Sequence, residues 1–125
     1  MPRKILVVED DPDIQKLVGT VFAKDYEVRG AGDGLAALME IEQGFKPDLI
    51  IADIMMPRLD GLSFVKALKN QRSTSGIPVM FLTAKSAPRD VIEGINVGAR
   101  FYLTKPFKVD ELVSKVHRLL PPPKK

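Results

Sequence analysis

Three short segments of the chain, 5–8, 49–52 and 79–82, are apolar at every position. Uninterrupted apolar runs of this length, rich in valine and isoleucine, are typical of strands in a parallel sheet that is covered on both faces. Two shorter and more mixed segments, 26–28 and 101–103, predict strands at the edges of the same sheet. The pattern therefore predicts a sheet with a buried centre and two partly exposed edges.

Between the strands, apolar residues recur every three or four positions, which predicts five amphipathic helices. The recurring residues are Ile14, Leu17, Val18, Val21 and Phe22; Leu35, Leu38 and Ile41; Leu62, Val65 and Leu68; Val91, Ile92 and Ile95; and Val109, Leu112, Val113, Val116, Leu119 and Leu120. Asp11, Asp33 and Asp60 are predicted to cap the first three helices at their N-termini. Gly44 is predicted to end the second helix.

Strand and helix alternate five times, which predicts an α/β fold: a doubly wound (βα)5 domain with helices on both faces of the sheet. A strand order of 2-1-3-4-5 places the three apolar strands inside and the two mixed strands outside. We expect one domain over residues 1–120. Residues 121–125, "PPPKK", cannot continue a helix and are expected to be a tail or the start of a linker.

Composition narrows the function classes. The 125 residues are 45% hydrophobic and 28% charged, as in an ordinary soluble domain. The net charge is +3, but the basic residues are scattered along the chain. The chain therefore lacks the basic run that would predict direct binding of nucleic acid. The chain has no cysteine, which excludes disulfides and thiol catalysis. Its first apolar run is too short for a signal peptide or a membrane span, so we expect a cytoplasmic protein without membrane contact.

Polar side chains follow four of the predicted strands. Glu9 and Asp10 come after the first, Asp53 after the third, Thr83 after the fourth and Lys105 after the fifth. In open α/β sheets, ligands bind at the carboxyl ends of the strands, near the point where the strand order reverses. For the order above, that point lies between the first and third strands, so these side chains are expected at one rim.

Several carboxylates at one place repel each other, and a divalent cation removes the conflict. Hard oxygen ligands with positions left for water and phosphate suit Mg²⁺. The alternative is that each acid only solvates a loop. That alternative is weak when Glu9, Asp10 and Asp53 come together with Lys105 nearby.

Four motifs carry a resemblance to a known family. The segments "ILVVEDDPDI", "DLIIADIMMPRLDG", "VMFLTA" and "YLTKPF" resemble the receiver (phosphoacceptor) domain of two-component response regulators, in the family's order and spacing. The resemblance covers essentially the whole chain and implies a flavodoxin-like fold. It also implies a signalling phosphoacceptor rather than an enzyme, one that catalyses its own phosphotransfer and slow autodephosphorylation.

The resemblance assigns roles to the acidic residues. Asp53 matches the aspartate that accepts a phosphoryl group from a sensor histidine kinase or a phosphotransfer protein. Asp10 and Asp53 would bind Mg²⁺ directly, together with the backbone carbonyl of Met55. Glu9 would act in the outer shell of the metal, through water.

The resemblance also assigns a switch. Lys105 would pair with Asp53 at rest and with a phosphoryl oxygen afterwards, while Thr83 would donate a hydrogen bond to the phosphoryl group. Tyr102 matches the aromatic residue that turns inward when the threonine moves. The family usually has a cis peptide before the proline at Pro106. The fourth helix, fifth strand and fifth helix would form the surface that binds an unknown downstream protein.

One departure from the family concerns that surface. Many transcription-factor receivers carry an acidic pair where this chain has Arg100 and Phe101, and that pair supports a symmetric dimer. We therefore expect a monomer in the unphosphorylated state and no strong symmetric dimer on activation.

Three other classes remain as alternatives. A flavin- or nucleotide-binding domain needs a phosphate loop rich in glycine, serine or threonine after the first strand, where this chain has acids. An aspartyl hydrolase would place a second aspartate two residues after Asp53, where this chain has Met55. A phosphorylation-independent scaffold would be expected to lose Asp53, Lys105 or Thr83, and this chain keeps all three.

Overall fold

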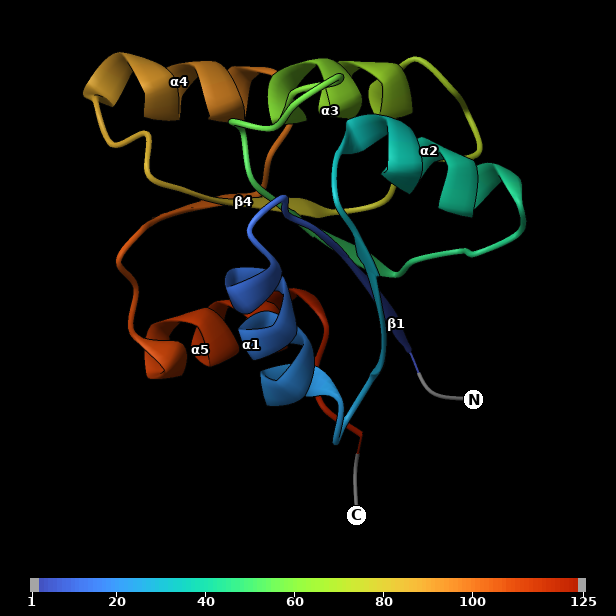
Figure 1. The fold of residues 1–125 in the computed structure, drawn as a ribbon, viewed down its shortest axis with the longest axis vertical. Coiled ribbons are helices and arrows are strands. Elements are labelled where there is room, and N and C mark those ends of the chain that lie inside the picture. Colours follow the sequence, from blue (N-terminus) through green and yellow to red (C-terminus); the bar gives the residue numbers. More distant parts are fainter. Residues whose placement is uncertain (1–2, 124–125) are drawn as a thin grey trace.

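The computed structural model describes residues 3–123 (Figure 1), so Lys124 and Lys125 of the predicted tail lie outside the described residues. The strands are β1 (Lys4–Val8), β2 (Glu27–Ala31), β3 (Leu49–Ala52), β4 (Val79–Thr83) and β5 (Phe101–Thr104). The helices are α1 (Pro12–Phe22), α2 (Gly34–Glu42), α3 (Gly61–Lys69), α4 (Pro88–Asn96) and α5 (Val109–Leu119). None of the described helices is long and apolar enough to cross a membrane.

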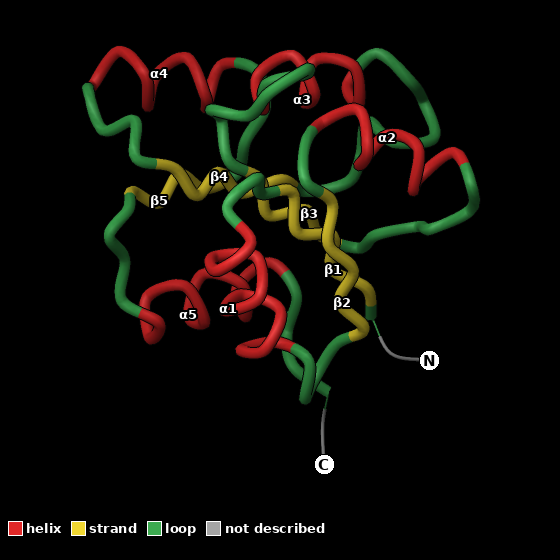
Figure 2. Tube along the Cα trace, in the orientation of Figure 1, coloured by secondary structure: helices red, strands yellow, loops and turns green. Residues whose placement is uncertain are grey.

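The five strands form one parallel sheet in the order β2-β1-β3-β4-β5, which confirms the predicted topology. Figure 2 shows three layers, with α2, α3 and α4 on one face of the sheet and α1 and α5 on the other. The order reverses beside β1, because the chain passes from β1 to the outer strand β2 and then returns to β3. The carboxyl ends of β1 and β3 therefore lie next to each other.

The predicted bounds of β2 were wrong. Tyr26 was expected in the strand, but its backbone N–H donates to the carbonyl of Phe22 at 3.0 Å and closes the end of α1. Its buried side chain donates to the backbone carbonyl of Leu120 at 2.5 Å. The strand instead continues to Ala31 through polar and exposed residues, which an apolar pattern cannot mark.

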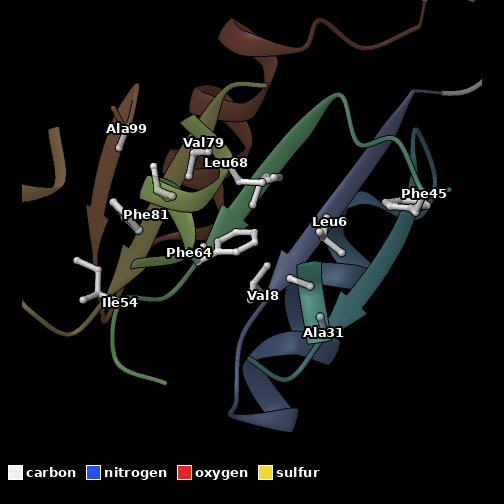
Figure 3. Close-up of a cluster of buried hydrophobic side chains, with 14 residues drawn as sticks. Leu6, Val8, Ala31, Phe45, Ile54, Phe64, Leu68, Val79, Phe81 and Ala99 are labelled. Carbon is white, nitrogen blue, oxygen red and sulfur yellow. The ribbon is translucent and has the colours of Figure 1, made fainter. Parts of the chain in front are cut away.

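Two apolar cores fill the space on either side of the sheet, since successive strand residues point to opposite faces. Leu6 faces α2, α3 and α4, together with Phe64 and Phe81, and Figure 3 shows this cluster. Ile5 faces the other way, in a cluster with Leu112 of α5. Full burial of one such side chain contributes about 1.5–3 kcal/mol, so these clusters fix the sheet that carries the rim residues.

The apolar spacing that predicted α4 does not mark its buried face. Ile92 and Ile95 are 60% and 44% exposed, whereas Gly94 is buried. The helix lies so close to β5 that a Cβ on Gly94 would come within 2.8 Å of the Tyr102 ring. A small residue, which adds nothing to an apolar pattern, therefore decides the orientation of this helix.

The predicted helix caps are confirmed. Asp11, Asp33 and Asp60 each accept a hydrogen bond from a backbone N–H in the first turn of the following helix, at 2.8 to 2.9 Å. Gly44 has a φ of +108°, a conformation that glycine adopts readily, and it ends α2 as predicted. Two of these caps matter for the rim: Asp11 starts α1 directly after Glu9 and Asp10, and Asp60 ends the loop that follows Asp53.

Candidate functional site

The rim at the carboxyl ends of the strands brings together the polar residues expected there. Carboxylate oxygens of Glu9, Asp10 and Asp53 all lie within 4.8 Å of one another. Glu9 and Asp53 are buried, with 3% and 6% of their surface exposed, whereas Asp10 is exposed. The acidic cluster therefore consists of one exposed and two buried carboxylates.

Lys105 joins the two buried acids. Its Nζ donates to Oε1 of Glu9 at 2.7 Å and to Oδ2 of Asp53 at 2.9 Å. The family resemblance implied the contact with Asp53, and the contact with Glu9 was not predicted. The peptide bond between Lys105 and Pro106 is cis, as the family resemblance implied.

The backbone holds Asp53 closely. The N–H of Met55 donates to its Oδ1 at 3.2 Å. On the other side, a Cβ on Gly61 would lie 2.1 Å from the Asp53 carbonyl oxygen, so only glycine fits there. Asp53 therefore presents its carboxylate from a fixed main chain.

Burial and charge act against each other in the cluster. Burial raises the pKa of Glu9 to about 7, although the hydrogen bond from Lys105 lowers it. Burial also disfavours the charge on Lys105, but hydrogen bonds to Glu9 and Asp53 outweigh this effect and raise its pKa. The site thus contains one cation, the Lys105 ammonium, beside three acidic side chains, whose combined negative charge one ammonium cannot neutralise.

Thr83 and Tyr102 are linked through the backbone of Lys85. The N–H of Lys85 donates to Oγ1 of the fully buried Thr83 at 3.3 Å, and the carbonyl of Lys85 accepts from the Tyr102 hydroxyl at 2.6 Å. The Tyr102 ring is half-buried and packs edge-on against Phe81. Burial raises the pKa of Tyr102 above its usual value.

An open pocket of about 460 Å³ lies beside the acidic cluster, and Asp10, Met55, Pro57 and Lys85 are among its lining residues. The Met55 side chain is 59% exposed. The ammonium of Lys85 lies 3.9 Å from Oδ1 of Asp90 on α4. The pocket has room for a small group beside Asp10, with an apolar and a cationic side chain on its wall.

Gln15 is a supporting residue that sequence reasoning missed. Its Nε2 donates to the carbonyl oxygens of Glu9 and Ala31, at 3.0 and 3.3 Å, and so ties the ends of β1 and β2 together. Room for this side chain exists because a Cβ on Gly30 would lie 2.1 Å from its Oε1. A polar residue directly after Ile14, near the start of an amphipathic helix, was the only available signal.

The acidic cluster fits a divalent cation. Its donor set consists of three carboxylates, the hard oxygen ligands that Mg²⁺ prefers. Within the cluster, Lys105 forms ion pairs with Glu9 and Asp53. It does not pair with the exposed Asp10, whose negative charge is thus left for a metal ion to neutralise.

Comparison with known proteins places this arrangement in a family. The sequence model of the response regulator receiver domain family matches residues 5–117 of this chain. Among similar proteins, the DNA-binding dual master transcriptional regulator RpaA of Synechocystis is 41% identical over 121 residues, which are 96% of this chain and 49% of RpaA. The phosphate regulon transcriptional regulatory protein PhoB of Klebsiella pneumoniae is 38% identical, with 96% of this chain and 52% of PhoB covered. This chain thus spans about half the length of these curated relatives.

Solved structures agree with the sequence match. The chemotaxis protein CheY4 of Vibrio cholerae has a TM-score of 0.89 at 35% identity, with 96% of this chain and 100% of that chain covered. The beryllofluoride-activated DrrB receiver domain has a TM-score of 0.87 at 30% identity, with 96% and 98% covered. Family match, fold and rim residues agree: the chain belongs to the response regulator receiver domains, the signalling domains of two-component systems.

Proposed function

We propose that this receiver accepts a phosphoryl group on Asp53 in a reaction that depends on Mg²⁺, and that phosphorylation switches a partner-binding surface. One observation carries the proposal: the buried Asp53 carboxylate is held by Lys105 at 2.9 Å within 4.8 Å of the carboxylates of Glu9 and Asp10. A buried anion is costly unless it is paired or coordinates a metal, so a cluster with more acids than cations is a reason to expect a functional site.

Receiver domains interact with histidine kinases or phosphotransfer proteins, so a phosphohistidine on such a partner is the proposed donor. An Asp53 oxygen attacks the phosphorus, the P–N bond breaks, and its electron pair returns to the imidazole nitrogen. A carboxylate is a weak nucleophile, and the reaction therefore depends on positioning and on neutralising phosphoryl charge.

The metal would be held by the side chains of Asp10 and Asp53 and the backbone carbonyl of Met55, with Glu9 acting through water. When bound, Mg²⁺ would neutralise charge on the phosphoryl oxygens. Lys105 would transfer one of its hydrogen bonds from Asp53 to a phosphoryl oxygen and keep its contact with Glu9.

The switch starts at Thr83. Its hydroxyl accepts from the N–H of Lys85, and its own proton would be donated to a phosphoryl oxygen on Asp53. A movement of Thr83 toward Asp53 would pull on Lys85, whose carbonyl holds Tyr102. Through Tyr102, the change would reach the surface of α4, β5 and α5, where the downstream protein is proposed to bind.

Incubation with acetyl phosphate and Mg²⁺, followed by intact mass measurement, tests the proposal. The wild-type chain should gain one phosphoryl group and Asp53→Asn should gain none. Asp60→Asn is the matched control, because asparagine also caps helices and Asp60 borders the same pocket. Undiminished labelling of Asp53→Asn would refute the assignment, and a wild-type chain that takes up no phosphate would favour a scaffold.

A further inference from the structure

The loop between Asp53 and α3 is attached to a helix from a different part of the chain. Nε and Nη2 of Arg58 both donate to Oδ2 of Asp33, with an Nε–Oδ2 distance of 2.7 Å. Oδ1 of the same carboxylate accepts the N–H of Ala36 at 2.9 Å as the cap of α2. The Asp33 side chain is only 5% exposed. The ion pair is therefore anchored in the body of the domain at its acidic end.

The backbone conformation of Arg58 points to a task for its side chain. Arg58 has a φ of +65°, in the left-handed region that costs free energy for residues other than glycine. Glycine or asparagine would adopt this conformation more readily. The guanidinium contact with Asp33 gives a reason for arginine at this position, because those residues cannot reach the carboxylate in the same way.

A backbone contact lies beside the ion pair. The N–H of Gly34 donates to the carbonyl of Leu59 at 3.2 Å, and a Cβ on Gly34 would come within 2.8 Å of that oxygen. The start of α2 thus touches the loop through both main chain and side chain. Without the guanidinium of Arg58, the hydrogen bond from Gly34 to Leu59 would be the one polar contact left of these.

At its other end, the same loop adjoins the acceptor. The N–H of Met55 contacts Oδ1 of Asp53, and the N–H of Gly61 donates to the carbonyl of Ile54 at 2.8 Å. Residues 54–57 and Asp60 line the pocket beside the acidic cluster. A displacement of this loop would therefore change the position of the Met55 backbone relative to the Asp53 carboxylate.

We infer that Arg58 is a positioning residue: its ion pair with Asp33 holds the loop of residues 54–60 against α2 and keeps the Met55 backbone in register with Asp53 for binding Mg²⁺. The inference rests on the proposed phosphoacceptor function, and it assigns part of the metal affinity to a contact outside the acidic cluster. Residues that orient the ligands of a metal typically change its affinity by 10- to 100-fold when mutated, so a loss of about tenfold is expected.

Two substitutions separate positioning from folding. Arg58→Gly removes the ion pair and relaxes the left-handed backbone, but it leaves the sheltered Asp33 carboxylate without its cation, so the melting temperature without metal is expected to fall. The Mg²⁺ affinity of this variant is therefore measured well below its melting temperature. Asp33→Asn removes the charge but keeps a residue that caps helices well. Each variant should weaken Mg²⁺ binding about tenfold, measured by calorimetric titration. The double variant should be no weaker than either single one, because both remove the same contact.

Arg58→Lys should recover part of the affinity, since lysine restores a cation without the forked geometry. Arg72→Gly, which removes an exposed arginine from the turn after α3, is the matched control and should bind Mg²⁺ as the wild type does. Wild-type affinity in Arg58→Gly would overturn the inference, as would independent, additive losses in the double variant. Phosphate uptake by the wild type is measured under the same conditions, so that the phosphoacceptor proposal and the role of Arg58 are tested separately. If the wild type takes up no phosphate, the proposed function is overturned, and this inference with it.

Discussion

The hydroxyl of Tyr102 donates a hydrogen bond of 2.6 Å to the backbone carbonyl of Lys85. The N–H of the same residue donates to the Thr83 hydroxyl at 3.3 Å. One residue of the β4–α4 connection therefore joins the buried hydroxyl at the end of β4 to an aromatic side chain on the edge strand. The ring reaches this carbonyl because Gly94 leaves space for it.

Gly94→Ala is expected to displace the Tyr102 ring and break its hydrogen bond to Lys85. The added Cβ would lie 2.8 Å from Cε2 of Tyr102 and 3.2 Å from Cδ2 of Phe81. Overpacking of this kind costs about 1–3 kcal/mol. Chemical denaturation gives the cost, and ring resonances in a Tyr26→Phe background report on Tyr102 alone. Gly76→Ala is the control, because nothing lies within 4 Å of a Cβ there; equal effects of the two substitutions would contradict the prediction.

Mg²⁺ is expected to raise the thermal stability of the unphosphorylated chain, because it binds the folded acidic cluster. A concentration 100 times the dissociation constant adds about 2.7 kcal/mol to the free energy of unfolding. Asp10→Ala should remove most of this dependence. Without metal, the variant should be at least as stable as the wild type, since one of three mutually repelling carboxylates is gone. Thermal melts across a Mg²⁺ titration measure both effects.

Glu42→Ala removes an exposed carboxylate at the end of α2 and should leave the Mg²⁺ response unchanged. A wild-type response in Asp10→Ala would show that the metal binds elsewhere.

The surface of α4, β5 and α5 is expected to disfavour a symmetric dimer. Arg100 is exposed, and the cationic groups of Lys115 and Arg118 lie 5.1 and 5.4 Å from the ring centroid of the half-buried Phe101. Two copies of this face would bring like charges together. Sedimentation velocity should show a monomer with and without beryllofluoride. A shift to dimer with beryllofluoride that Arg100→Asp does not alter would show that this departure from the family is unimportant.

The phosphoryl group on Asp53 is expected to be lost slowly. Met55 is apolar and cannot orient an attacking water, and the Lys85 ammonium lies near Asp90. Met55→Asn combined with Lys85→Glu should speed the loss of phosphate several-fold, and each tenfold change corresponds to about 1.4 kcal/mol of barrier. Intact mass against time measures the rate. Met39→Asn changes a methionine of similar exposure on α2 and should keep the wild-type rate. A double variant that keeps its phosphate as long as the wild type would mean that these side chains do not control water access.

The sequence alone was sufficient to predict the strands that are buried on both faces of the sheet. Strands β1, β3 and β4 are apolar at nearly every position because helices cover both of their sides. Strand β2 is an edge strand with exposed Glu27 and Arg29, so backbone pairing with β1 defines it more than any side-chain pattern.

The rim residues were predictable because each lies at the carboxyl end of a strand or within two residues of it, and parallel strands end together. Contacts between distant segments were not predictable in this way. The pairing of Arg58 with Asp33 and the fit of Tyr102 against Gly94 depend on how α2 and α4 sit on the sheet. That placement is a property of three-dimensional packing, and neither arginine nor glycine shows it in a pattern of apolar residues.

The strand order has a consequence for where the backbone opens. Strand β3, which leads to Asp53, is hydrogen-bonded to β1 on one side and to β4 on the other, whereas β5, which carries Tyr102, pairs only with β4 among the described strands. Amides in a central strand exchange with solvent only through large-scale unfolding, while those of an edge strand exchange through smaller local openings. The proposed chemistry is thus placed on a strand that stays closed, and the proposed response on a strand that opens at lower cost.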